Sequence, residues 1–204
     1  MPAAESSFHW LQQHFVEIIA VITGLLYVIL AIHKNPLLWL FGIISSGLYV
    51  WIFYHSGIYA YAFLYVYYVV IGLYGWYNWS GKSKDKQEQY NLAVQRTSKS
   101  ILWLCISLTL ALVIPITFFL KKFTSSDLPM ADAFLTAGGF VATWMLTQKY
   151  IEQWLFWIII DLSTMGVMIY QKLYPSALLF LIYTLLAIKG FVQWKKELKA
   201  QPVK

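Results

Sequence analysis

The chain has 204 residues, of which 60% are hydrophobic and 12% charged, and its mean hydropathy is +0.61. An ordinary soluble domain has about 45–50% apolar and about 25% charged residues, so the composition excludes a soluble globular protein and indicates an integral membrane protein. The net charge is +6, but the basic residues cluster between apolar segments, which indicates topology signals and argues against a nucleic-acid partner.

Seven apolar segments are long enough to span a bilayer when the Tyr and Trp residues at their ends are included. In chain order they cover residues 16–32, 37–54, 58–79, 100–120, 131–148, 152–170 and 175–194. The pattern predicts an all-α integral membrane protein with seven transmembrane helices. We expect an N-terminal outer segment at residues 1–15 and a basic cytoplasmic tail at residues 195–204.

The basic residues predict the orientation of these helices. Eleven of the fifteen Lys and Arg residues lie on one side of the predicted helices, and three lie on the other side. The positive-inside rule therefore places the N-terminus outside and the C-terminus inside. The chain has no basic residue before Lys34, so we expect no cleavable signal peptide.

The sequence also contains an internal repeat at an offset of 115 residues. Matching pairs include Lys34 and Lys149, Trp39 and Trp154, Gly75 and Gly190, and Trp79 and Trp194. We expect two parallel three-helix repeats, at residues 16–79 and 131–194, joined by a basic cytoplasmic loop and a connecting helix at residues 80–130. Parallel repeats of this kind occur in transporters that bind their substrate near the midplane of the membrane.

The segment that begins at residue 152 carries one carboxylate in an apolar run. Trp154, Trp157 and Asp161 share a helix face, since they are spaced i, i+3 and i+7. Asp161 lies roughly 10 Å deeper than Trp154, near the middle of a hydrocarbon layer about 30 Å thick. A carboxylate there costs at least ~2.5 kcal/mol, so we expect it to face a cavity. Two indoles beside an acid predict a site for a flat cationic ring.

The matching positions in the first repeat lack this face. Gly42 stands where the second repeat has Trp157, and Ser46 stands where it has Asp161. We therefore expect the two halves to be specialised differently for ligand binding.

Other candidate binding residues lie on the third and seventh predicted helices. Tyr61, Tyr65 and Tyr68 share a face at helical spacing, and Tyr183 and Thr184 lie at a similar depth. A tyrosine stripe is also typical of ordinary helix packing, so packing remains the alternative for these residues.

The sequence lacks the usual marks of other activities. The four histidines are scattered, the single cysteine cannot form an internal disulfide, and no phosphate-binding glycine-rich motif occurs. We expect no metal, no cofactor and no direct use of ATP. An intramembrane enzyme that used Asp161 would need a second catalytic group nearby, which makes it a weaker hypothesis. A ligand sensor remains open because it would use the same pocket.

With these motifs, the chain resembles the Pnu family of bacterial vitamin transporters over nearly its whole length. The resemblance rests on Trp154, Trp157 and Asp161, on Tyr-Gly-Trp-Tyr-x-Trp at residues 74–79 and on Lys-Tyr-x-Glu at residues 149–152. It implies a 3+1+3 fold, similar to but larger than that of the SWEET sugar transporters. It also implies a homotrimer in the bacterial inner membrane and facilitated diffusion, with a cytosolic kinase that traps the product by phosphorylation.

The resemblance implies a vitamin substrate and leaves two vitamins open. Nicotinamide riboside carriers of the family have Asn where this chain has Asp161, and Gln where it has Tyr65. A carboxylate favours a ligand with positive charge and amino donors, which fits thiamine slightly better than nicotinamide riboside. We therefore expect a thiamine uniporter, with nicotinamide riboside as the alternative. Trp154 and Trp157 are expected to stack on the ring, and Asp161 to accept hydrogen bonds or balance charge.

Overall fold

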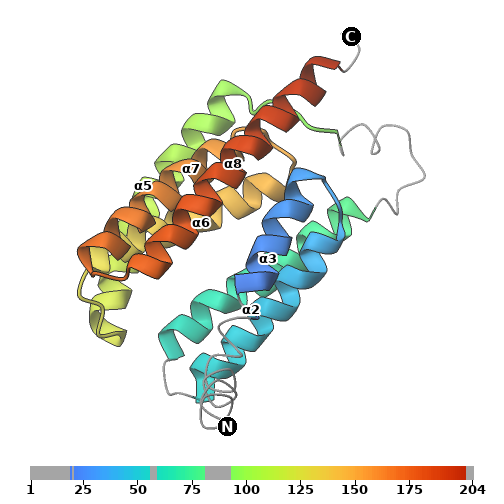
Figure 1. The fold of residues 1–204 in the computed structure, drawn as a ribbon. Helices are drawn as coiled ribbons and strands as arrows, with labels where there is room; N and C mark the ends of the chain where they lie inside the picture. The colour runs from blue at the N-terminus through green and yellow to red at the C-terminus, as the bar shows by residue number, and fades with distance from the viewer. Residues whose placement is uncertain (1–18, 20, 56–58, 81–92, 201–204) are drawn as a thin grey trace, which may run out of the picture.

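The protein is described by a computed structural model that covers residue 19 and residues 21–55, 59–80 and 93–200. The helices are Val21–Ile32, α2 (Leu37–His55), α3 (Tyr59–Trp79), α5 (Lys99–Phe123), α6 (Pro129–Thr147), α7 (Gln153–Tyr170) and α8 (Tyr174–Ala200) (Figure 1). The only bridge in this part of the chain is the isolated pair of Gln95 and Tyr150. The all-α prediction is confirmed for these residues, whereas the predicted outer segment at 1–15 lies outside them.

Four helices, α2, α5, α7 and α8, are long and apolar enough to cross a membrane. The helices α3 and α6 are of similar length; α3 is rich in tyrosine, and α6 is rich in Gly, Ala and Thr. On α5, Trp103, Ile114 and Phe118 are 67–77% exposed. So much exposed apolar surface is stable in lipid and unfavourable in water, which supports an integral membrane protein.

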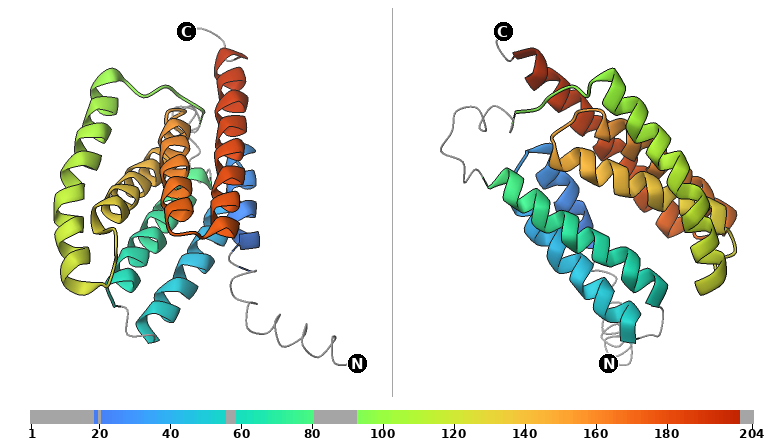
Figure 2. Two further views of the ribbon diagram at one scale, coloured as in Figure 1. Left: turned by 60° about the vertical axis from the view of Figure 1, so that its left-hand side comes forward. Right: turned by 180° about the vertical axis from the view of Figure 1, so that it is seen from behind.

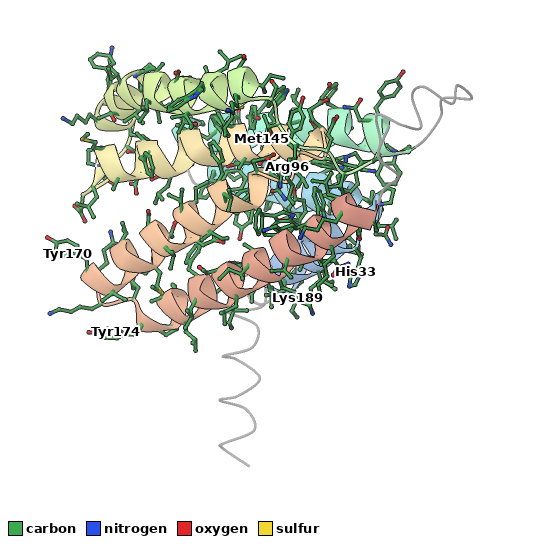
Figure 3. All side chains as sticks on the ribbon, turned by 90° about the horizontal axis from the view of Figure 1, so that it is seen from above. His33, Arg96, Met145, Tyr170, Tyr174 and Lys189 are labelled. Atoms are coloured by element: carbon green, nitrogen blue, oxygen red, sulfur yellow. The ribbon has the colours of Figure 1, made fainter. Side chains whose placement is uncertain are left out.

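Aromatic residues also mark one end of the bundle. Tyr170 and Tyr174, which flank the turn between α7 and α8, are 75% and 63% exposed. Figure 3 shows both at one end of the molecule, with His33 toward the other end. Tyrosine at a helix end is typical of a membrane–water interface, where its ring is apolar and its hydroxyl group is hydrated.

The last predicted helix is longer in the structure. α8 continues to Ala200, whereas we expected the helix to end at residue 194. Glu197 forms an ion pair with Lys34, and Leu198 packs against the buried core. Both contacts hold the last turns of α8 against the rest of the bundle, and Lys and Glu are good helix formers.

The first helix of each half contacts the other half. Within each half, α2 packs mainly on α3, and α7 packs mainly on α8. The helix Val21–Ile32 lies beside α8 of the other half, and α6 contacts α3 (Figure 2). α5 packs along α6 at the edge of the bundle (Figure 2). These contacts join the two halves, while α6 also packs on α5 and on α7 of its own half.

Two turns with the same rare backbone conformation recur at the 115-residue offset. Lys34 and Lys149 have positive φ angles of 55° and 54°. The Lys34 N–H donates to the carbonyl of Ala31 at 3.1 Å, and the Lys149 N–H donates to that of Leu146 at 3.0 Å. Positive φ is uncommon for residues other than glycine, so the match supports a duplicated structure.

Buried tryptophan pairs also recur at this offset. Trp39 meets Trp79 edge to face, with ring centroids 5.6 Å apart and an interplanar angle of 89°. Trp154 meets Trp194 in the same way, at 5.5 Å and 87°. Edge-to-face packing is favourable because the positive ring edge meets the negative face of its partner.

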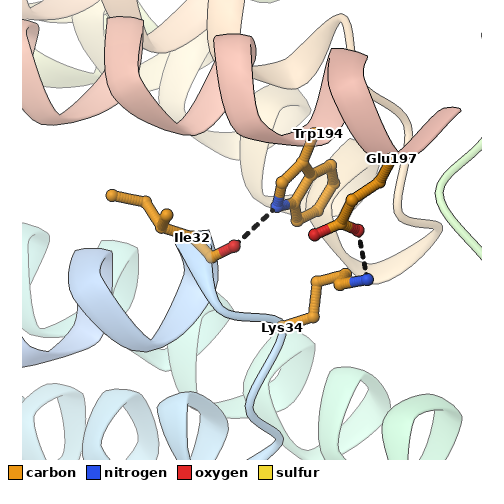
Figure 4. Close-up of polar contacts among 4 residues, drawn as sticks. All are labelled: Ile32, Lys34, Trp194 and Glu197. Atoms are coloured by element: carbon orange, nitrogen blue, oxygen red, sulfur yellow. Dashed lines mark hydrogen bonds and ion pairs between the residues drawn. The ribbon is translucent and has the colours of Figure 1, made fainter. Parts of the chain in front are cut away.

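The second indole of each pair then bonds across to the other half. Trp79 Nε1 donates to the carbonyl of Thr147 at 3.1 Å, and Trp194 Nε1 donates to that of Ile32 at 3.0 Å (Figure 4). Both acceptors lie at the end of the first helix of their half. The two bonds are equivalent and crossed, so they tie each half to the other at the same end of the bundle.

Charged groups lie at the same end. Lys34 pairs with Glu197 beside the Trp194 bond (Figure 4), and Lys149 places its Nζ 4.5 Å from the centroid of the Trp79 ring. Burial, together with the positive charge of Lys34, lowers the pKa of Lys149 to about 8. The two turns therefore bring positive charge into a partly desolvated cluster at this end.

The segment before α5 is attached to the turn between α6 and α7. The Gln95 N–H donates to the Lys149 carbonyl at 3.2 Å, and the Ile151 N–H donates to the Gln95 carbonyl at 3.0 Å. Thr97 donates through its N–H and Oγ1 to Glu152 Oε2, at 2.9 and 2.7 Å. α5 is thereby joined to the second half.

The tryptophan pairs predict which glycines are essential. A Cβ added at Gly75 or Gly190 would lie 2.5 or 2.6 Å from the indole of Trp39 or Trp154. Gly75→Ala and Gly190→Ala should each destabilise the fold by about 1–3 kcal/mol through overpacking, seen as a lower Tm in detergent. At Gly47 an added Cβ meets nothing within 4 Å, so Gly47→Ala is the control. Equal Tm values for all three variants would contradict this packing.

The crossed bonds make a second prediction. Trp194→Phe removes the N–H that pairs with the Ile32 carbonyl, whereas Trp39→Phe removes an Nε1 that has no partner among the described residues. Both indoles are buried and lose similar volume. Trp194→Phe should therefore cost about 1 kcal/mol more stability than Trp39→Phe, measured by thermal unfolding in detergent. An equal loss would argue against a stabilising bond between the halves.

Candidate functional site

A cavity of about 240 Å³ lies along α7 and α8 and is closed on one side by the helix Val21–Ile32. Its lining includes Gln153, Trp154, Trp157, Asp161, Phe180 and Tyr183. The predicted face of two tryptophans and one acid thus borders this cavity, since the spacing of these residues puts them on one side of α7.

The Asp161 side chain is buried and borders the smaller cavity, a position that would suit a ligand-binding acid. The residue is 6% exposed and lines the cavity. Within the described part of the chain, no group donates a hydrogen bond to its carboxylate and no cation pairs with it. A buried charge without a partner is costly, so a positively charged or hydrogen-bond-donating ligand would be stabilised beside it.

A second cavity, of about 300 Å³, lies along α2 and α3. Hydroxyl groups are frequent in its lining, from Ser45, Ser46, Tyr49, Tyr65, Tyr68 and Thr143. Trp157 lines both cavities, so its indole stands at the boundary between them. The Asp161 carboxylate lines the cavity on one side of this boundary, and the hydroxyl groups line the cavity on the other.

The two cavities occupy equivalent places in the two halves. At the offset of 115 residues, Trp39, Gly42, Ser46, Tyr65, Tyr68 and Gly72 of the larger cavity match Trp154, Trp157, Asp161, Phe180, Tyr183 and Ala187 of the smaller one. The repeat therefore supplies two similar spaces, and the substitutions between the halves give them different chemistry.

Two tyrosines reach the cavities by close contact with a glycine of the opposite half. A Cβ at Gly139 would lie 2.8 Å from the Tyr68 hydroxyl, and a Cβ at Gly24 would overlap that of Tyr183. Each pair is the 115-residue equivalent of the other. The small residues let the hydroxyl groups approach the facing helix, as is common between membrane helices.

The structure brings most of the predicted site residues to these cavities. The smaller cavity is lined by Trp154, Trp157, Asp161 and Tyr183, and the larger by Tyr65, Tyr68 and again Trp157.

Tyr61 and Thr184 line neither cavity. The Tyr61 ring packs 5.5 Å from that of Phe53, and Thr184 Oγ1 donates to the carbonyl of Phe180 at 2.9 Å. Thr184 follows Tyr183 by about 100° around the helix, which turns it away from the space that Tyr183 borders.

Sequence reasoning missed several lining residues. Tyr49 and Thr143 add hydroxyl groups to the larger cavity, and Gln153 lines the smaller one. Gln153 precedes Trp157 and Asp161 at intervals of four residues, and that spacing was a usable signal. No group of three or more His, Cys, Asp or Glu residues in the described ranges is placed to hold a metal ion.

Several known proteins are similar to this chain in sequence. The nicotinamide riboside transporter PnuC of Escherichia coli (strain K12) is 26% identical over 202 residues, covering 88% of this chain and 84% of that protein. PnuC of Neisseria mucosa is 24% identical, covering 89% of this chain and 72% of that protein. The riboflavin/roseoflavin transporter RibM of Streptomyces davaonensis is 23% identical over 127 residues, covering 62% and 59%.

The fold has a counterpart among solved structures. The crystal structure of the vitamin B3 transporter PnuC matches with a TM-score of 0.73 and 20% identity, covering 97% of this chain and 88% of that one. A sequence model of the family described as nicotinamide mononucleotide transporter matches residues 14–196, a range that contains both cavities. The resemblance to the Pnu family is thereby confirmed, and the chain belongs to the nicotinamide mononucleotide transporter family of integral membrane proteins.

Proposed function

We propose that this protein transports nicotinamide riboside across the membrane by facilitated diffusion. The observation that carries the proposal is the pair of equivalent cavities that meet at Trp157, one lined by hydroxyl groups and the other by indoles and an acid. Two of the relatives are named nicotinamide riboside transporters and none of those described above is named for thiamine, which favours the riboside over our first expectation.

The chemistry of the cavities fits the two parts of this ligand. Its pyridinium ring is flat and positively charged, and it suits the indole faces of Trp154 and Trp157 and the charge of Asp161. Its ribose carries several hydroxyl groups, which suit the larger cavity. Thiamine carries a single hydroxyl group and would leave most of that polar lining without a partner.

The proposed mechanism is alternating access by two parallel halves in a 3+1+3 arrangement of seven spans. It is supported by the turns, tryptophan pairs and cavities that recur at the 115-residue offset. Rocking of one half against the other about a central site would open each side in turn. We propose that the N-terminus is outside and that the Lys34–Glu197 end is cytoplasmic, since the basic loops predict this orientation.

Accumulation by diffusion needs a sink, and we propose phosphorylation by a cytosolic kinase in a bacterium, with the transporter in the inner membrane. We further propose a homotrimer, to which the exposed apolar face of α5 would contribute. An intramembrane enzyme is less favoured, because the described residues that line the two cavities include no second acid or histidine beside Asp161.

Uptake into proteoliposomes tests the proposal. The wild-type protein should take up nicotinamide riboside, and excess thiamine should compete weakly. Trp157→Ala should lower the uptake at limiting substrate at least about tenfold, because it removes the aromatic face at the boundary of both cavities. Trp51→Ala, at an exposed position on α2 that lines neither cavity, is the matched control and should retain uptake. Thiamine uptake without riboside uptake would overturn the assignment.

The charge of Asp161 predicts a difference between two forms of the ligand. Asp161→Asn keeps the side-chain shape but removes the charge, so it should weaken binding of the cationic riboside about tenfold. The reduced, uncharged dihydronicotinamide riboside should bind both proteins about equally. Titration calorimetry on the purified proteins gives the dissociation constant of each ligand. If the substitution weakened binding of both ligands equally, the charge itself would not be recognised.

A further inference from the structure

Gln153 is a buried amide that the fold does not satisfy. It is the first residue of α7 and is 0% exposed. Neither its Nε2 nor its Oε1 has a hydrogen-bond partner among the described residues. A primary amide offers two donors and an acceptor, and burial without partners is costly for both ends. Gln153 also lines the smaller cavity, so a group that could pair with it has a space to occupy.

The repeat shows that packing does not require this amide. The 115-residue equivalent of Gln153 is Leu38, which is also 0% exposed. An apolar side chain therefore meets the demands of this position in the first half. The second half has a polar group at the same depth, on the same helix as Trp157 and Asp161. The amide thus occurs in the half that carries Asp161, which is expected if the amide binds the ligand.

The three side chains form a row along α7. Gln153, Trp157 and Asp161 are spaced by four residues and line one cavity. Gln153 and Asp161 are about 12 Å apart along the helix axis, with Trp157 between them. A ring stacked on Trp157 would therefore have one end toward the amide and the other toward the acid.

We infer that Gln153 is a specificity-determining residue that pairs with a carboxamide edge on the ring of the ligand. This inference rests on the proposed function. After rotating toward the cavity that it borders, the Gln153 side chain donates from Nε2 to the carboxamide oxygen and accepts through Oε1 from the carboxamide nitrogen. A carboxylate at this place offers two acceptors and no donor, so the acid analogue loses one of the two bonds. A site that forms both of these hydrogen bonds rejects analogues that leave one of its buried polar groups unpaired.

Binding of three ribosides to the purified full-length transporter tests the inference by calorimetry. The ligands are nicotinamide riboside, nicotinic acid riboside and the riboside of unsubstituted pyridine. The wild type should prefer the carboxamide over the other two by at least about thirtyfold. Gln153→Leu, which installs the residue that the first repeat uses, should reduce this preference to about threefold or less. Binding of the pyridine riboside should not change, whereas a merely structural role would weaken all three.

Two further variants complete the test. Gln148→Leu should keep the full preference, because the Gln148 amide bonds to Tyr74 and Thr147 and lines neither cavity. Gln153→Met keeps a linear side chain without the amide and replaces Gln153→Leu if that variant does not fold. A full carboxamide preference in the Gln153 variant overturns the inference and leaves the proposed function intact. If the wild type binds none of the ribosides, the proposed function and the inference both fail.

Discussion

Two indole N–H groups, those of Trp79 and Trp194, bond across the molecule to the carbonyls of Thr147 and Ile32. Within a bilayer the lipid is as apolar as the side chains, so burial alone does not select one arrangement of helices. Directional hydrogen bonds and close packing on small residues do select one arrangement of the helices. Because the two bonds are crossed, they tie each half to the other beside the cavities that Trp39 and Trp154 line.

The 115-residue repeat pairs residues that line the two cavities, and a few substitutions give the cavities different linings. Where the first half has Leu38, Gly42 and Ser46, the second has an amide, an indole and a carboxylate. The first half keeps small and hydroxyl-bearing groups, so its cavity is larger and more polar. The bulk of Trp157 extends to the boundary and makes the two spaces neighbours. Recognition of a ligand with a cationic ring and a polar sugar would use this asymmetry.

The charged cluster at one end places a constraint on any movement of the halves. Lys34 on the first half pairs with Glu197 on the second, and Lys149 lies over the ring of Trp79 on the first. Opening this end would separate the ion pair, the cation–π contact and both crossed bonds together. The segment before α5 is bonded to the turn that carries Lys149, so α5 would move with the second half.

Local sequence determined the helices and the row of Trp154, Trp157 and Asp161, because both follow from spacing between near neighbours. Comparison of the sequence with itself determined the 115-residue repeat. The helix ends agree to within a few residues where Pro36 and similar turn residues interrupt an apolar run. Only the tertiary structure decided that α8 continues to Ala200, that Tyr61 and Thr184 line neither cavity and that Gln153 borders one of them. The bonds that join the halves link residues 68 and 162 positions apart, and helical periodicity contains no information about which distant carbonyl an indole will reach.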